Sequence, residues 1–306
     1  MRAVQFDAYG GIDVLRVGDA PDPEPGPGEA LVRVRAAGTN PDDVPIREGM
    51  LAELFPRPFP AGQGSDLAGV IEAVGPGVTR MSIGAHVLGF THRHDAQAEL
   101  VAVPVHHLVR KPASVSWEVA GALPLVGVTA WAAVHAVQLR PRETVVVSAA
   151  AGGVGSLVVQ LARRAGARVI GIAGRHHHSW LREHGVTPVE HHGDIAEAVR
   201  RAAAGPVHAL IDCYGHGYVR MGVEELDVDP GRIDTVVDMV AAHRFGTKNR
   251  GQASGAHAHV LDELVQLLSA GELEVPIAAA LPVEDVQTAY RVLEEHHTHG
   301  KIVLMF

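Results

Sequence analysis

A glycine-rich turn between an apolar run and a helix-like segment is the feature that most constrains the fold of this chain. Residues 144–166 read TVVVSAAAGGVGSLVVQLARRAG, and the three consecutive valines are typical of a parallel strand buried on both faces. Ala150, Gly152 and Gly155 occupy the key positions of the G-x-G-x-x-G pattern, with alanine in place of the first glycine. A strand, a glycine turn and a helix in this order predict a βαβ unit that binds a dinucleotide.

Each part of the turn has a physical role in such a site. At Gly152 the absence of a side chain lets the backbone approach a pyrophosphate, and at Gly155 it lets the helix pack closely on the strand. A helix that begins near Val154 directs N–H groups and the positive end of its dipole at the phosphates. We therefore predict that the whole turn binds the cofactor: Ala150, Ala151, Gly152, Gly153, Val154 and Gly155. A turn that is rich in glycine only for packing is the alternative.

The end of the second strand predicts which dinucleotide is bound. In folds that bind NAD, an acidic residue about 20 positions after the motif holds the ribose 2′-hydroxyl. Here that position is Arg175, preceded by Gly174. A guanidinium attracts a 2′-phosphate, which a carboxylate would repel. We predict NADPH as the cofactor, with Gly174, Arg175 and His178 among its contacts.

The basic run at 175–178, Arg-His-His-His, has two other interpretations. It is read either as a solvated loop or, because three histidines are adjacent, as part of a metal site. A metal site needs further ligands, and the sequence has no evident spaced partner for these histidines. We therefore predict no metal.

The remaining pattern divides the chain into two regions. Residues 1–117 contain short strands broken by glycine and proline, such as ALVRVRAAG at 30–38, where apolar residues alternate with arginine. Residues 118–252 alternate apolar strands with helical segments, which is the pattern of parallel βαβ units. After residue 253 come two amphipathic helical segments and a last strand, KIVLMF.

Composition narrows the classes of function. The formal net charge of −9 argues against a nucleic-acid surface, which needs clustered Lys and Arg. Cys213 is the single cysteine, which excludes an internal disulfide and fits a reducing cytoplasm. The N-terminus does not resemble a signal peptide, and no apolar run reads as long enough to cross a bilayer. We predict a cytoplasmic protein that acts on a small molecule, without nucleic-acid or membrane partners.

Five segments occur along the chain in a characteristic order and spacing: YGGIDVL (9–15), EALVRVRAAGTNPDD (29–43), GQGSDLAGVIEAVGPGV (62–78), LPLVGVTAW (123–131) and HGKIVL (299–304). They resemble the medium-chain dehydrogenase/reductase superfamily, and within it the zinc-independent quinone oxidoreductase branch that includes zeta-crystallin. The resemblance implies an α/β protein in which residues 1–117 and 253–306 form a GroES-like β-barrel catalytic domain. Residues 118–252 would form a Rossmann domain with a doubly wound parallel sheet. Dimers are common in the family, so a homodimer is expected.

The residues at the family's zinc positions imply a reaction without metal. Zinc-dependent members carry a ligating Cys shortly after the second strand and a Gly-His-Glu motif further on. This sequence has Ala-Gly-Thr-Asn at 37–40 and Gly-Gln-Gly-Ser-Asp at 62–66. A catalytic zinc needs three protein ligands, which these positions do not supply.

Loss of a Lewis acid favours a substrate whose reduction leaves a delocalised anion, namely a quinone or an α,β-unsaturated carbonyl. The resemblance implies hydride transfer from NADPH to such a substrate, with Asn40 beside the nicotinamide and Thr129 in contact with the cofactor. Many members carry a tyrosine just after the position of Gly49, which this chain lacks. Tyr9 and Tyr214 are therefore further catalytic candidates.

Two other functions stay open. A biosynthetic enzyme of the same fold would catalyse a specialised reduction or a cyclisation, which the missing tyrosine makes plausible. A protein that binds NADPH without turnover, as lens crystallins of this family do, is the second.

Overall fold

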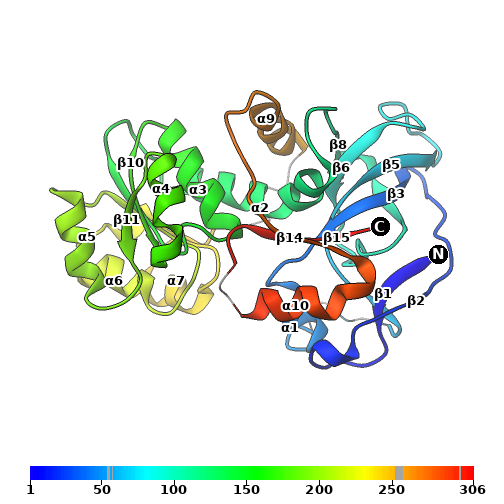
Figure 1. Cartoon of the computed structure of the whole chain (residues 1–306), viewed down its shortest axis with the longest axis horizontal. Helices are drawn as coiled ribbons and strands as arrows, with labels where there is room; N and C mark the ends of the chain where they lie inside the picture. Colours follow the sequence, from blue (N-terminus) through cyan, green and yellow to red (C-terminus); the bar gives the residue numbers. More distant parts are fainter. Residues whose placement is uncertain (54–55, 57, 252–257, 296–297) are drawn as a thin grey trace. The chain divides into compact units, whose positions relative to one another are not determined.

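The computed structural model describes residues 1–53, 56, 58–251, 258–295 and 298–306. Figure 1 follows the chain through its elements, and the chain divides into two compact units. Unit 1 comprises Met1–Leu125 and His257–Phe306, and unit 2 comprises Val126–Ala256. The first boundary between the two units therefore lies at residue 125, inside a helix, whereas the sequence pattern predicted it at residue 117. The other expected boundary, between 252 and 253, lies outside the described residues.

Unit 1 is built on a seven-stranded sheet in which the longest strand, β3, has three partners. The strand pairs are antiparallel except for the parallel pair of the two C-terminal strands. The sheet order is β14 (Ile277–Pro282), β15 (Lys301–Met305), β3 (Glu29–Gly38), β5 (Asp66–Val74), β6 (His86–Phe90) and β8 (Leu108–Arg110), with β7 (Leu100–Pro104) beside β3. In β3, Val32 and Val34 are buried while Arg33 and Arg35 are exposed, as the alternation predicts.

Unit 1 also contains a smaller three-stranded sheet, built from N-terminal segments of the chain. It contains β2 (Arg16–Asp19), β1 (Arg2–Phe6) and β4 (Ala61–Gly62). Among the described residues, the α-helices that lie wholly within this unit are α1 (Asp43–Arg47), α9 (Ala258–Ser269) and α10 (Val286–Glu294). Phe6 of β1, Tyr290 of α10 and Leu304 of β15 share one buried apolar cluster. Burial of such side chains, about 1.5–3 kcal/mol each, ties the N- and C-terminal segments into one unit.

Unit 2 contains a five-stranded parallel sheet. Its order is β11 (Thr187–Glu190), β10 (Arg168–Ala173), β9 (Thr144–Val147), β12 (Ala209–Asp212) and β13 (Ile233–Thr235). The α-helices that lie wholly within the described residues of this unit are α3 (Gly153–Arg164), α4 (His178–Glu183), α5 (Ile195–Ala203), α6 (Tyr218–Glu224) and α7 (Met239–Phe245). The chain runs outward from β9 to β11 and then returns to the other side of β9. Ligands of open α/β sheets bind at the carboxyl ends of the strands beside such a reversal.

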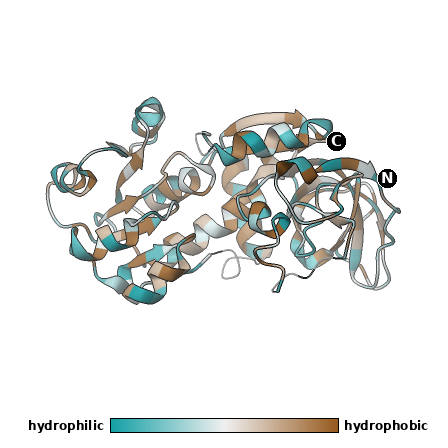
Figure 2. Ribbon diagram, turned by 90° about the horizontal axis from the view of Figure 1, so that it is seen from below, coloured by the Kyte–Doolittle hydropathy of each residue, from teal (hydrophilic) through white to brown (hydrophobic). Residues whose placement is uncertain are grey.

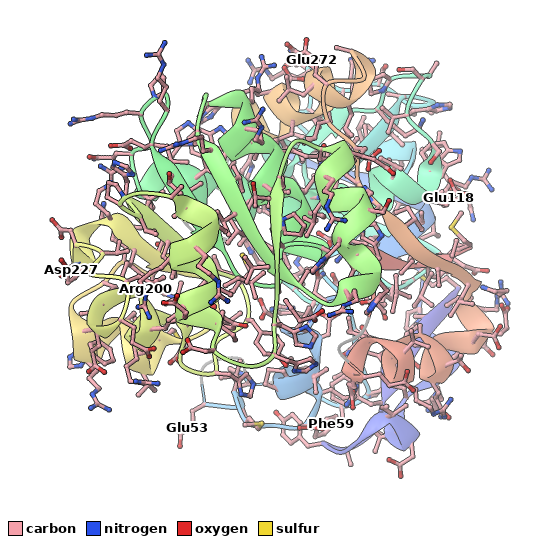
Figure 3. The ribbon with its side chains drawn as sticks, turned by 60° about the vertical axis from the view of Figure 1, so that its left-hand side comes forward. Glu53, Phe59, Glu118, Arg200, Asp227 and Glu272 are labelled. Carbon is pink, nitrogen blue, oxygen red and sulfur yellow. The ribbon has the colours of Figure 1, made fainter. Side chains whose placement is uncertain are left out.

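Helices cover both faces of this sheet, which confirms the doubly wound Rossmann-like arrangement. Ile170 and Ile172 of β10 face an apolar cluster that includes Val199 of α5 and Val219 of α6. Gly171 between them faces the other way, because a Cβ there would lie 3.3 Å from Cδ2 of Leu181 in α4. Hydropathy colour alternates along the helices around the sheet (Figure 2), as expected of amphipathic helices. Charged residues such as Arg200 and Asp227 lie on the outside (Figure 3).

One helix corrects a sequence-based expectation. Within the described ranges, α2 (Trp117–Ala136) has the length and apolar composition needed to cross a membrane, although no such run was expected. Of its apolar window, 78% is buried inside the protein. The core helix of a soluble protein passes the same test of length and composition, so this is weak evidence of a membrane span.

Candidate cofactor and active site

The predicted nucleotide turn connects β9 to α3 in unit 2. The four residues of β9 are buried, and Ala150 and Ala151 in the turn are buried as well. A Cβ at Gly155 would lie 2.1 Å from the backbone oxygen of Ala149, far inside van der Waals contact. Glycine at 155 is therefore what lets α3 pack this closely on the turn.

Helix α3 begins at Gly153, one residue before the predicted start. Gly152 is its N-cap, in an extended conformation with φ −76°, and no side chain caps the helix. The first N–H groups of any α-helix have no intrahelical acceptor. Together with the helix dipole they give this end of α3 the properties of a phosphate-binding site.

A pocket of about 520 Å³ lies at the carboxyl end of β10, the neighbouring strand. Its lining residues are mostly basic: Arg175, His176, His178, Ser179, Arg182 and Glu190. Arg175 has 88% of its side chain exposed. His178 is less free, because its Nε2 lies 3.2 Å from the backbone oxygen of Ala173. The predicted residues Arg175 and His178 thus share one pocket.

Arg182 and Glu190 complete this pocket and were missed from the sequence. Arg182 lies four residues after His178, on the same side of α4, which helical spacing would have revealed. Glu190 ends β11, and its Oε2 lies 3.3 Å from Nε of Arg175. Burial raises the pKa of Glu190, but the hydrogen bond from Arg175 and the nearby His178 and His191 lower it by more. The net effect is a lowered pKa and an ionised carboxylate at neutral pH.

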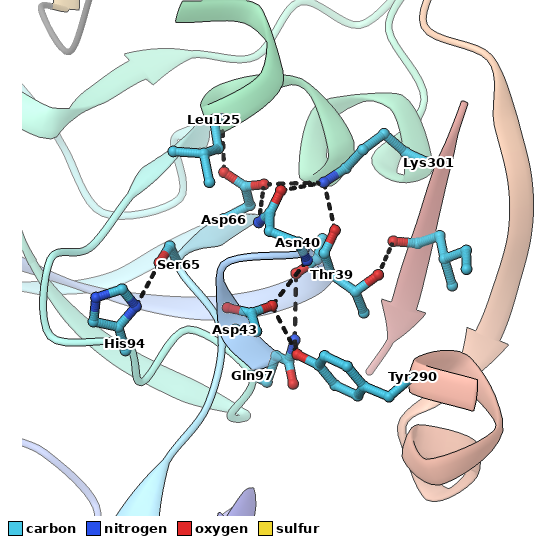
Figure 4. A network of polar contacts seen from close by, with 12 residues as sticks. Thr39, Asn40, Asp43, Ser65, Asp66, His94, Gln97, Leu125, Tyr290 and Lys301 are labelled. Carbon is cyan, nitrogen blue, oxygen red and sulfur yellow. Dashed lines mark hydrogen bonds and ion pairs between the residues drawn. The ribbon is translucent and has the colours of Figure 1, made fainter. Parts of the chain in front are cut away.

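Asn40 lies in unit 1, at the centre of a buried polar network (Figure 4). Its Nδ2 donates to Oδ2 of Asp66 at 2.9 Å, and its Oδ1 accepts from Nζ of Lys301 at 2.5 Å. Lys301 also donates to the backbone oxygen of Thr39 and lies 3.6 Å from Asp66. Asp66 in turn accepts from the backbone N–H of Leu125 in α2 at 2.8 Å. The Asn40 amide is therefore held from both ends.

A second carboxylate lies on the other side of Asn40. Asp43 Oδ2 accepts from the backbone N–H of Asn40 and from the hydroxyl of Tyr290, both at 2.8 Å. Gln97 donates to that hydroxyl at 2.8 Å. Burial raises the pKa of Asp43 to about 7, and it also raises the pKa of Asp66 and lowers that of Lys301. Desolvation is thus the main electrostatic cost of this network.

The other predicted residues occupy different places. Thr129 is buried within α2. Tyr9 packs its ring against Gly49, where a Cβ would lie 2.7 Å from its Cγ, and against Phe59 at a centroid distance of 5.0 Å. Tyr214 follows β12 in unit 2 and is 46% exposed. Tyr214 thus shares the carboxyl edge of the parallel sheet with the nucleotide turn and Arg175, whereas Asn40 and Tyr9 belong to unit 1.

Asp212 organises the loop that carries Tyr214, and sequence reasoning missed it. This fully buried residue ends β12 and accepts from the hydroxyls of Ser148 at 2.6 Å and Thr235 at 2.9 Å. The backbone N–H groups of Tyr214 and Gly215 donate to the same carboxylate. The ends of β9, β12 and β13 are therefore linked through one side chain.

Comparison with known proteins identifies relatives over the whole chain. Residues 26–113 match the family model of the alcohol dehydrogenase GroES-like domain, and residues 185–304 match that of the zinc-binding dehydrogenases. A quinone oxidoreductase of Pseudomonas aeruginosa is 30% identical over 99% of both chains. The solved quinone oxidoreductase of Coxiella burnetii gives a TM-score of 0.90 at 29% identity, over 100% of this chain and 99% of that one. A crystal structure named NAD-dependent alcohol dehydrogenase gives 0.88 at 31% identity, over 100% of both chains.

Proposed function

Because the chain belongs to the medium-chain dehydrogenase/reductase superfamily, in its quinone oxidoreductase branch, we propose that it is an NADPH-dependent reductase of a quinone or of the activated C=C of an enone. The protein is an oxidoreductase of this family. The proposal that the cofactor is NADPH rests on the pocket at the end of β10, where Arg175 and Arg182 lie together with His176 and His178.

The charge of this pocket supports NADPH over NADH. One relative is named NAD-dependent, so the argument rests on the residues themselves. Two guanidiniums form strong, charge-assisted hydrogen bonds with a phosphate dianion and gain nothing comparable from a ribose hydroxyl. The turn Ala150–Gly155 and the N-terminus of α3 would hold the pyrophosphate. When bound, the cofactor supplies a hydride.

The network around Asn40 does not fit the zinc that the second family model implies. At the first of the family's ligand segments, Asn40 is bonded to the ammonium of Lys301 and to Asp66. At the second, Ser65 Oγ bonds to Nδ1 of His94 at 3.0 Å. A buried ammonium already compensates the carboxylate here, and a dication beside it would be repelled. We therefore propose that the reaction proceeds without metal.

In such a reaction the residues of the protein would orient the reacting groups, and water would supply the proton. Addition of hydride to the β-carbon of an enone leaves an enolate, which takes a proton from water at the α-carbon. Asn40, fixed by Lys301 and Asp66, is proposed to orient the reacting groups, and Tyr9 and Tyr214 stay candidates for contact with the substrate. Loss of such a preorganised group lowers turnover by about a hundredfold, so the turnover of Asn40→Ala is expected to fall by that factor. The turnover of Tyr9→Phe and of Tyr214→Phe is expected to fall by less than about tenfold.

Isotope transfer tests the reaction. With NADPH deuterated at C4 and a panel of quinones and enones, an enone product is expected to carry the label at its β-carbon. In D2O with ordinary NADPH, deuterium is expected at the α-carbon instead. An enone-derived product without hydrogen from NADPH would contradict the proposal in favour of a cyclisation. NADPH binding without any product across the panel would favour a protein that binds the cofactor without turnover.

A further inference from the structure

Two histidine runs that are separate in the sequence meet at one edge of the parallel sheet. His176–His178 follow β10, and His191 and His192 follow β11. The two strands are parallel neighbours in which Ala173 pairs with Glu190. The carboxyl ends of adjacent parallel strands lie side by side, so the second run supplies the spaced partner that the first run lacked in sequence.

The second run has the geometry of a metal-binding group. Over the part of the chain that the structure describes, Glu190, His191 and His192 are the one set of three potential ligands with donor atoms all within 4.8 Å of one another. Oε1 of Glu190 lies 3.1 Å from Nδ1 of His191, and the two imidazole centroids are 3.7 Å apart. Both histidines are exposed, so an ion from solution can reach them.

A histidine of the first run lies beside this group. A Cβ at Gly174 would lie 2.8 Å from Cε1 of His176 and 3.4 Å from Cε1 of His191. The two imidazoles therefore flank the same glycine, which leaves room between the strand ends. His176 is therefore a neighbour of the group formed by Glu190, His191 and His192.

We propose that Glu190, His191 and His192, with His176 beside them, bind a divalent transition-metal ion such as Zn²⁺ or Ni²⁺. Imidazole nitrogens combined with one carboxylate suit these borderline ions, whereas Ca²⁺ and Mg²⁺ prefer sites made of oxygen ligands. The site is separate from the zinc positions of the family, which lie in unit 1. It holds the metal at the edge of the cofactor pocket and takes no part in hydride transfer.

Glu190 couples this site to the pocket. The same carboxylate pairs with Arg175, with Oε2 directed at the guanidinium and Oε1 at His191. A metal bound to Glu190 withdraws negative charge from Arg175 and adds positive charge beside it. The ion therefore strengthens binding of a 2′-phosphate, and linkage requires NADPH to strengthen binding of the metal by the same factor. This second step rests on the proposed preference for NADPH.

Titration of untagged, chelator-stripped protein with Zn²⁺, followed by calorimetry, tests the site. Each wild-type chain is expected to have one Zn²⁺ site whose affinity exceeds that of any other Zn²⁺ site on the chain. The double variant His191→Ala/His192→Ala is expected to bind at least about tenfold more weakly, the loss that even outer-sphere changes produce. A matched control, His92→Ala/His106→Ala, removes two exposed histidines of a different cluster and is expected to bind as wild type does. Equal binding by the two double variants, or no saturable binding to wild type, would overturn the proposal.

Cofactor titrations with and without saturating Zn²⁺ test the coupling. We expect Zn²⁺ to lower the Kd of wild type for NADPH, to leave that for NADH unchanged, and to have no effect on either in His191→Ala/His192→Ala. The double variant also corrects for metal bound by the cofactor itself. Metal binding without any change in the NADPH affinity would overturn the coupling. Metal binding with equal affinity for NADPH and NADH would overturn the preference for NADPH and sustain the metal site.

Discussion

The exposed side chain of Arg175 is suited to binding a ligand and contributes little to the stability of the fold. Its side chain is 88% exposed, and its ion pair with Glu190 is at the surface. Exposed ion pairs contribute little to stability, typically 0–1 kcal/mol. The residue is therefore available to a ligand, and its substitution is expected to change binding with little effect on folding.

Reversal of this charge is the most direct test of cofactor choice. Arg175→Asp is expected to weaken NADPH binding by about ten- to a hundredfold, since a charge-assisted contact contributes roughly 1.5–3 kcal/mol. NADH binding should be retained or improved. The measurement is kcat/KM for both cofactors, with Arg201→Asp, an exposed arginine of α5, as the control. An unchanged ratio of the two efficiencies in Arg175→Asp would contradict the assignment.

Asp43 shows the opposite situation, a carboxyl whose burial raises its pKa to about 7. The folded-state pKa exceeds the unfolded value, so its contribution to stability is fully present below about pH 4. That contribution is lost as the pH rises through 7. Asp43→Asn cannot ionise and should lack this loss.

Chemical denaturation at pH 4 and pH 8 measures the difference. Between these values, wild type is expected to lose up to roughly 4 kcal/mol of unfolding free energy relative to Asp43→Asn, at about 1.4 kcal/mol per pKa unit. Asp227→Asn, at an exposed position, should follow wild type. A constant difference between wild type and Asp43→Asn at both pH values would show that folding does not raise the pKa of Asp43.

At the scale of elements, the β9–α3 connection depends on one close approach. Because a Cβ at position 155 would lie 2.1 Å from the backbone oxygen of Ala149, Gly155→Ala must displace α3 from the turn. Overpacking of this kind costs typically 1–3 kcal/mol, and the shifted helix end should bind phosphate less well.

Melting temperature and NADPH affinity together test this prediction. Both are expected to fall in Gly155→Ala and to stay near wild type in Gly205→Ala, where a Cβ would meet one atom at 4.0 Å. Retention of full NADPH affinity in Gly155→Ala would separate packing of the helix from cofactor binding.

For the whole molecule, metal and turnover should be independent. After exhaustive dialysis against a chelator, quinone reduction at saturating NADPH is expected to remain within about twofold of the untreated enzyme, because the proposed reaction has no step that requires a Lewis acid. Elemental analysis of the dialysed protein should find less than one zinc per chain. Loss of turnover on dialysis, restored by zinc, would contradict the metal-free reaction.

The sequence by itself determined the features that depend on neighbouring residues. The buried valines of β9, the close packing at Gly155 and the alternation in β3 follow from local sterics and from the period of side-chain burial. Arg175 and the histidines after it could likewise be placed at a strand end by counting along the chain. Tertiary structure decided which groups face them. Lys301 reaches Asn40 from 261 positions away, and Glu190 meets Arg175 only because β10 and β11 are neighbours in the sheet. Pairing of buried or clustered charges depends on distances that chain topology sets, and no local pattern encodes them.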